Sequence, residues 1–161
     1  MKTYFTSDYH LFHNNIIKYC ERPFKTIEEM NEAIIKNHNS LVKEEDTVFF
    51  LGDFCFTNKE DIIKKLNGHF VFIKGNNDHD NSLKTIIRSC VIKIGGQEIY
   101  LVHDPDDYNP KFRINLVAHV HNLWKVKKIK GCTLVNVGVD VWDFKPITID
   151  MILKEIAGSV Q

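Results

Sequence analysis

The hydrophobic positions of the chain fall into short runs, and the clearest of these is residues 47–51. Apolar or β-branched residues in unbroken succession predict a strand that is buried on both faces. The run stops at Gly52-Asp53, so a carboxylate stands at a fixed point where the strand ends. Because no lysine or arginine is adjacent to Asp53, its charge needs a partner of another kind.

Further apolar runs predict the other strands of the chain, at residues 2–7, 69–74, 91–94, 98–102, 114–118, 123–129, 133–137 and 147–149. Gly95-Gly96 and Lys130-Gly131 each separate two of these runs, and such glycine-containing pairs favour hairpin turns. The other strands are mostly separated by longer segments, which leave room for helices.

Helical spacing of apolar residues occurs at residues 27–42, 59–66, 83–87 and 150–156, and we expect a short helix within residues 11–20. The longest helix has a defined start, because Thr26 and Glu29 have the spacing of a capping box. Asn67-Gly68 is a turn signal after the second helix. The chain is therefore expected to have a mixed α/β fold.

Length and composition fit one globular domain of residues 1–161, with a hydrophobic fraction of 43%. Lysine plus arginine equals aspartate plus glutamate at 21 each, which argues against strong, sequence-independent nucleic-acid binding. The four cysteines are widely spaced, so we expect reduced thiols in the core. No apolar run is as long as a membrane span and no signal peptide is recognisable, so we expect a cytoplasmic protein.

Five of the predicted strands end in side chains that bind divalent metals. These side chains are Asp8, His10, Asp53, Asn76, His103, His119 and His121. Ligands gather at the carboxyl ends of strands in open α/β sheets, so these residues can converge although they are far apart in sequence. If the chain is extended there, residues i and i+2 share a side, and each Asp-x-His or His-x-His pair delivers two ligands to one place.

Taken singly, each of these motifs has an ordinary structural explanation, since Gly-Asp after a strand is usually a turn. Together they supply seven nitrogen and oxygen donors and no thiolate, which suits manganese, iron, cobalt, nickel or a catalytic zinc. Seven ligands are too many for one ion and are right for two ions that share a carboxylate. We therefore expect two divalent ions bridged by Asp53, an arrangement that activates water and holds a phosphoryl group.

The order of these motifs resembles that of the calcineurin-like metallophosphoesterases. The similarity covers most of the chain and is closest to the small uncapped bacterial and phage members, which also carry segments like Arg22-Pro23-Phe24 and residues 136–142. The resemblance implies a two-sheet αββα sandwich and attack of a metal-bridging hydroxide on a phosphoester. It also implies one ion on Asp8, His10, Asp53 and His121, and a second on Asp53, Asn76, His103 and His119. Manganese is the first choice of metal.

Asn77 stands where the resemblance implies a histidine that protonates the leaving group. An amide cannot supply that proton, and loss of a general acid typically costs about 10²–10⁴ in rate. Three interpretations are open. His79 or His13 replaces the acid, the enzyme uses good leaving groups, or Asn77 was introduced to trap substrate.

An open groove without a cap favours phosphodiesters, either small molecules or nucleotides, as substrates. The alternatives are a phosphomonoesterase or nucleotidase, and a metal-dependent binding module without catalysis. No feature of the sequence specifies an oligomeric state.

The basic hairpin after the metal-site histidines has two interpretations. It carries Trp124 and the lysines Lys125, Lys127, Lys128 and Lys130. Lysines protect exposed strand edges, which is the interpretation we favour. Alternatively, the lysines attract nucleotide phosphate and Trp124 stacks on a base. We expect structural or exposed positions for His38 and His69, and a turn role for Asp104.

Overall fold

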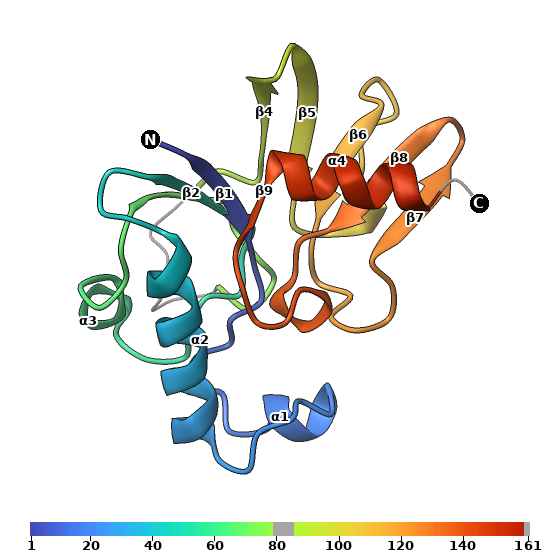
Figure 1. Cartoon of the computed structure of the whole chain (residues 1–161). Helices are drawn as coiled ribbons and strands as arrows, with labels where there is room; N and C mark the ends of the chain where they lie inside the picture. The colour runs from blue at the N-terminus through green and yellow to red at the C-terminus, as the bar shows by residue number, and fades with distance from the viewer. Residues whose placement is uncertain (79–85, 160–161) are drawn as a thin grey trace.

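The computed structural model describes residues 1–78 and 86–159, and its strands form two sheets (Figure 1). The smaller sheet has the order β3-β2-β1-β9. In it β1, β2 and β3 are parallel and β9 is antiparallel to β1. The strands span Thr3–Thr6 (β1), Thr47–Phe50 (β2), His69–Phe72 (β3) and Ile147–Thr148 (β9).

The larger sheet has the order β4-β5-β6-β8-β7. Its strands span Ser89–Ile94 (β4), Gln97–Val102 (β5), Ile114–Val117 (β6), Val126–Ile129 (β7) and Cys132–Asn136 (β8). Both predicted hairpins are confirmed, since β4 pairs with β5 and β7 with β8, each antiparallel. Gly95 and Gly96 have positive φ angles, as have Lys130 and Gly131, which explains the preference for glycine in these turns.

The described helices are Ile16–Tyr19 (α1), Ile27–Leu41 (α2), Lys59–Ile63 (α3) and Ile149–Gly158 (α4), with 3₁₀ turns at Pro105–Asp107 (η1) and Val139–Val141 (η2). The Thr26 hydroxyl accepts the Glu29 N–H at 3.2 Å, so the predicted cap of α2 is confirmed. The predicted helix at 83–87 falls mainly outside the described residues, and Ile86 and Ile87 are not helical. No helix in the described part of the chain has the length and apolarity needed to cross a bilayer.

Strand β2 is buried on both sides, as its apolar run predicts. Val48 and Phe50 pack in clusters with residues of α2 and the segment after it, and Phe49 and Leu51 pack in the cluster between the sheets. Successive residues of a strand point to opposite faces, so one short segment serves both layers. The expected two-sheet metallophosphatase-like α/β fold is thereby confirmed, with α2 on the smaller sheet and α4 against β1, β8 and β9.

Candidate metal centre

Backbone hydrogen bonds tie together the loops that follow the strands. Asp8 N–H donates to the Gly52 carbonyl and His10 N–H to the Asp53 carbonyl, both at 3.0 Å. In the larger sheet, Ala118 N–H donates to the His103 carbonyl at 2.9 Å. Residues that are distant in sequence are therefore held at one edge of the two sheets, as the pattern of strand ends predicts.

The loops after β2 and β3 approach so closely that only glycine fits at their contact. A Cβ on Gly52 would lie 2.5 Å from the Gly75 Cα, and Gly52 also has a φ of +95°. A Cβ on Gly75 would collide with the Asp53 carboxylate. The buried Asp78 carboxylate locks the contact, because it accepts the N–H groups of Gly75 and Asp53, each at 2.8 Å. Asp53 is thus fixed from both loops.

Most of the predicted ligands have a left-handed backbone. Positive φ angles, between 47° and 70°, occur at Asp8, His10, Asp53, His119 and His121. Non-glycine residues in this region are strained, and such strain concentrates at functional sites. The expectation of an extended chain at Asp-x-His and His-x-His is therefore wrong. His119 and His121 also belong to different groups of donors, so the His-x-His motif does not deliver two ligands to one place.

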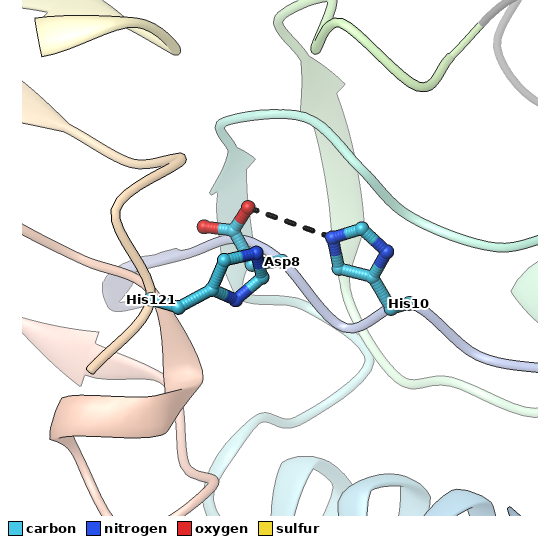
Figure 2. Close-up of side chains that lie close together, drawn as sticks. All are labelled: Asp8, His10 and His121. Atoms are coloured by element: carbon cyan, nitrogen blue, oxygen red, sulfur yellow. Dashed lines mark ion pairs between the residues drawn. The ribbon is translucent and has the colours of Figure 1, made fainter. Parts of the chain in front are cut away.

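The first group of donors is Asp8, His10 and His121, each with one ligand atom within 4.8 Å of the others (Figure 2). The Asp8 Oδ2 accepts the Ser7 hydroxyl at 2.6 Å and the His119 N–H at 3.1 Å. Its other oxygen, Oδ1, is buried without a hydrogen bond, as is His10 Nε2 3.9 Å away. Buried polar atoms almost always have a hydrogen bond, so two such atoms that lack one and lie close together fit a cation between them.

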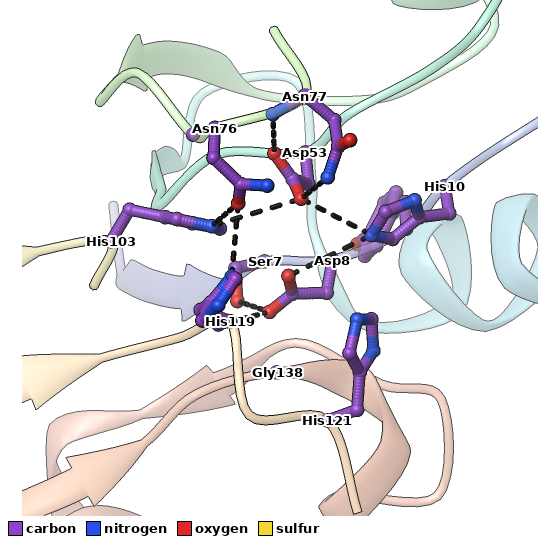
Figure 3. Close-up of polar contacts among 12 residues, drawn as sticks. Ser7, Asp8, His10, Asp53, Asn76, Asn77, His103, His119, His121 and Gly138 are labelled. Carbon is purple, nitrogen blue, oxygen red and sulfur yellow. Dashed lines mark hydrogen bonds and ion pairs between the residues drawn. The ribbon is translucent and has the colours of Figure 1, made fainter. Parts of the chain in front are cut away.

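The second group is Asp53, His103 and His119, with Asn76 beside them (Figure 3). The His103 Nδ1 lies 2.6 Å from the Leu51 carbonyl oxygen, which can only accept, so Nδ1 carries the hydrogen. In the neutral ring Nε2 then carries a lone pair and no hydrogen, and it lies 2.9 Å from the Asn76 Oδ1. His119 Nδ1 also lies 2.9 Å from that oxygen. Such converging acceptors suit a cation.

Asp53 lies between the two groups. Its Oδ2 is 3.3 Å from His10 Nε2 and 3.7 Å from His103 Nε2. Burial raises the pKa of Asp53, but the facing His10 and His103 rings and the Asn77 amide outweigh burial and hold this pKa below its usual range. The structure therefore brings together all seven side chains that the sequence singles out. Their nitrogen and oxygen donors fit divalent metal ions.

The three candidates for proton transfer or substrate contact lie in different places. Asn77 donates to both oxygens of Asp53, from its backbone N–H at 2.9 Å and from its side-chain amide at 2.6 Å. His13 lies beside His10, with its Nδ1 3.3 Å from His10 Nδ1. Burial, then the neighbouring His10, lowers the pKa of His13, which disfavours the protonated form that a general acid needs. His79 lies outside the described residues.

A buried ion pair that the sequence analysis did not assign supports His121. The Asp140 Oδ2 lies 3.0 Å from His121 Nδ1, and Arg22 holds the same carboxylate through Nε at 2.8 Å and Nη2 at 2.9 Å. Arg22 also donates to the backbone carbonyls of Asp8 and Tyr9. Burial lowers the pKa of His121, but the Asp140 hydrogen bond and other neighbours outweigh burial and raise it to about 10. The signal was present, since both residues stand in segments that carry the family resemblance.

Asn136 fixes the loop that bears His121. Its amide nitrogen donates to the carbonyls of His121 at 2.8 Å and Trp124 at 2.9 Å, and its oxygen accepts the Gly138 N–H at 2.8 Å. A Cβ on Gly138 would lie 2.9 Å from the Asn136 Oδ1 and 3.0 Å from the Asp8 Oδ2, so any other residue would have to displace these side chains.

Two cavities adjoin the second group of donors. One, of about 730 Å³, is lined by Asn76 and His103 together with Lys74 and Arg88. The other, of about 260 Å³, is lined by His119, Trp124 and Lys127. Both interpretations of the basic hairpin retain support, because β7 is an edge strand with exposed lysines and Trp124 also lines a cavity beside the site.

The two packed sheets and the clustered acid, amide and imidazole side chains define a metallophosphatase-like protein. The model of the calcineurin-like phosphoesterase superfamily domain matches residues 1–157, and the chain belongs to this superfamily. The family expected from the motifs is thereby confirmed.

Proteins of other organisms are similar to this chain in sequence or in fold. The chain is 38% identical to an uncharacterized protein of Methanocaldococcus jannaschii over 96% of this chain and 91% of that one. A crystal structure of a protein of unknown function from Aquifex aeolicus matches with a TM-score of 0.72 and 26% identity, covering 94% of this chain and 97% of that one. Vps29 of Entamoeba histolytica shares the fold, with a TM-score of 0.52 and 21% identity over 84% of this chain and 73% of that one.

Proposed function

We propose that the protein is a dinuclear, metal-dependent phosphoesterase that hydrolyses phosphodiesters. Asp8, His10, Asp53 and His121 would hold one ion, and Asp53, Asn76, His103 and His119 the other. Two ions in this position, when bound, polarise a phosphoryl oxygen and make water a nucleophile near neutral pH. Manganese is our first choice of metal, and the cytoplasm our expected compartment.

The observation that carries this proposal is the position of the Asp53 Oδ2. This oxygen lies 3.3 Å from His10 Nε2, in the first donor group, and 3.7 Å from His103 Nε2, in the second. A carboxylate in that position can serve both groups at once, which is what a bridging ligand must do. Asp78 holds the Asp53 backbone through its N–H, and the two Asn77 donors hold the Asp53 carboxylate between the groups.

The groups around the site orient the metal-binding side chains and restrict the leaving groups that the enzyme can use. The Leu51 carbonyl holds Nδ1 of His103 and Asp140 holds Nδ1 of His121, which would leave the second nitrogen of each ring free for an ion. Asn77 can donate a hydrogen bond but no proton. We therefore expect the enzyme to work best on esters whose leaving groups need no protonation.

One observation favours a second candidate, a binding module without catalysis. The Asn77 side-chain amide donates to the Asp53 Oδ2, the atom that the proposed reaction needs for the ions. If that contact persisted with metal present, the site would bind phosphoesters without hydrolysing them.

A metal-content and substrate assay tests the proposal. Protein loaded with manganese is expected to hydrolyse bis(4-nitrophenyl) phosphate faster than 4-nitrophenyl phosphate, and Asp53→Asn to abolish this activity. Asp61→Asn is the matched control, since Asp61 is an exposed acid paired with Lys64. Manganese binding without turnover would support the binding module, and faster hydrolysis of the monoester would support a phosphomonoesterase or nucleotidase.

A further inference from the structure

Three aromatic side chains, two of them exposed, lie together beside the first donor group. We call His13, Tyr19 and Phe56 the aromatic rim. The rings of His13 and Phe56 are stacked, with centroids 4.3 Å apart and an angle of 18° between their planes. Tyr19, at the end of α1, contacts the His13 ring edge-on at 6.1 Å. Segments after two different strands thus bring these rings together.

The rim is held in place by the backbone. Phe56 N–H donates to the Leu11 carbonyl at 2.9 Å, and Leu11 N–H donates to the Phe54 carbonyl at 3.1 Å. Phe54 itself is fully buried among other aromatic rings. Phe56 is nevertheless 47% exposed and Tyr19 69% exposed. The core therefore anchors this segment while two large rings stay in contact with solvent.

The rim adjoins the proposed reaction centre directly. The Phe56 ring stacks on His10, with centroids 5.7 Å apart and an angle of 20°. The His10 ring in turn lies 5.1 Å from that of His121. If a phosphodiester binds with its phosphoryl group at the proposed ions, its ester group has to extend past only the His10 ring to reach Phe56.

The exposed aromatic side chains Tyr19 and Phe56 at this position favour a planar ring in the ligand. Stacking of a base on an aromatic side chain tolerates any base, because every base has a π-face. Equal numbers of acidic and basic residues offer no general attraction for a long polyanion, which favours a small ligand. We infer that the aromatic rim binds the nucleobase of a small nucleotide phosphodiester. This inference rests on the proposed function and defines its substrate class.

Three esters with the same leaving group test this inference. They are the 4-nitrophenyl phosphodiesters of thymidine at its 5′ position, of the corresponding base-free deoxyribose, and of methanol. Wild-type protein is expected to have a higher kcat/KM for the thymidine ester than for the base-free ester. Phe56→Leu, which keeps an apolar side chain but removes the ring, is expected to reduce this preference by about 5- to 100-fold.

Two control variants separate the role of the ring from changes in folding. Phe56→Tyr keeps an aromatic ring and is expected to keep the preference. Val91→Ala removes a comparably exposed apolar side chain on β4 and is expected to leave it unchanged. An unchanged preference in Phe56→Leu, or no preference in the wild type, would overturn the inference. An equal fall for all three esters would also overturn it, because the nitrophenyl ring would then be the group on Phe56.

The inference and the proposed function fail in different ways. Hydrolysis of the methyl ester tests the proposed function without any base present. If no ester is hydrolysed, the proposed function fails, and calorimetric binding of thymidine 5′-monophosphate and methyl phosphate to the manganese-loaded protein decides the inference. Tighter binding of the nucleotide that Phe56→Leu abolishes would support base binding, and equal affinities in the wild type would contradict it.

Discussion

Replacing Asp140 with asparagine is expected to weaken one metal position and spare the other. The Asp140 carboxylate contacts His121 and Arg22. His121 lies with Asp8 and His10 in the first donor group and also close to Cys20 and Asp140, but it is not part of the second donor group. An uncharged amide holds the imidazole less firmly and no longer enhances its basicity. Loss of such a supporting carboxylate typically costs about 10–100-fold in metal affinity. The second group keeps its own support from the Leu51 carbonyl.

Titration of metal-free protein with manganese, followed by calorimetry, measures this effect. Wild-type protein is expected to bind two ions, and Asp140→Asn to bind one with unchanged affinity and the other about 10–100-fold more weakly. Asp143→Asn is the matched control, because Asp143 is an exposed acid three positions away with a positive φ that asparagine tolerates. Equal weakening of both ions, or of neither, would refute the assignment of His121 to one ion and its support by Asp140.

The same substitution is expected to lower stability in the absence of metal. Arg22 is only 4% exposed and would lose its charged partner. Breaking a buried ion pair by removing one charge typically costs about 3–5 kcal/mol. Urea unfolding in the presence of a chelator measures this cost, and an unchanged midpoint would show that the pair contributes little.

Three further predictions concern the loops, the core and the leaving group. Gly75→Ala is expected to lower manganese affinity and activity together, because its Cβ collides with the Asp53 carboxylate; Gly158→Ala, with open space around its Cβ, is the control in the same metal titration. Burial lowers the pKa of His38 from 6.5 to about 4, so its contribution to stability is complete above pH 6.5 and is lost as the pH falls towards 4. Chelator-treated wild type is expected to lose about 3 kcal/mol more than His38→Gln over that interval in urea unfolding, and parallel pH curves would contradict this. Asn77→His is expected to raise turnover of alkyl esters more than that of nitrophenyl esters, and equal gains would argue against a missing proton donor.

Local patterns in the sequence were sufficient to predict most of the helices and strands. The capping pair Thr26 and Glu29 defines the start of α2, and the unbroken apolar run at residues 47–51 makes β2 recognisable. The expected helix at 59–66 is too long, since α3 ends at Ile63. The next residues form i to i+3 bonds instead, from Lys65 to Ile62 and from Leu66 to Ile63. Such tightened turns are common at helix ends and carry no distinct pattern of apolar residues.

The identity of the site residues was predictable, but their geometry was not. Asp8, His119 and their neighbours could be found because polar donors follow apolar runs. Their left-handed backbone depends on hydrogen bonds between loops, which no local pattern specifies. The contact between Arg22 and Asp140 joins residues 118 positions apart, and only the folded chain reveals it. Burial of His38 between Tyr9 and Asn67 likewise arises from tertiary packing, although a structural role was expected.

Anomalous diffraction from a crystal grown with excess manganese would locate the ions held by the two donor groups. We expect two ions roughly 3.5–4 Å apart, with the Asp53 carboxylate bound to both. His121 is expected on one ion and His119 on the other. A single ion, or two ions with Asp53 bound to only one of them, would contradict this expectation.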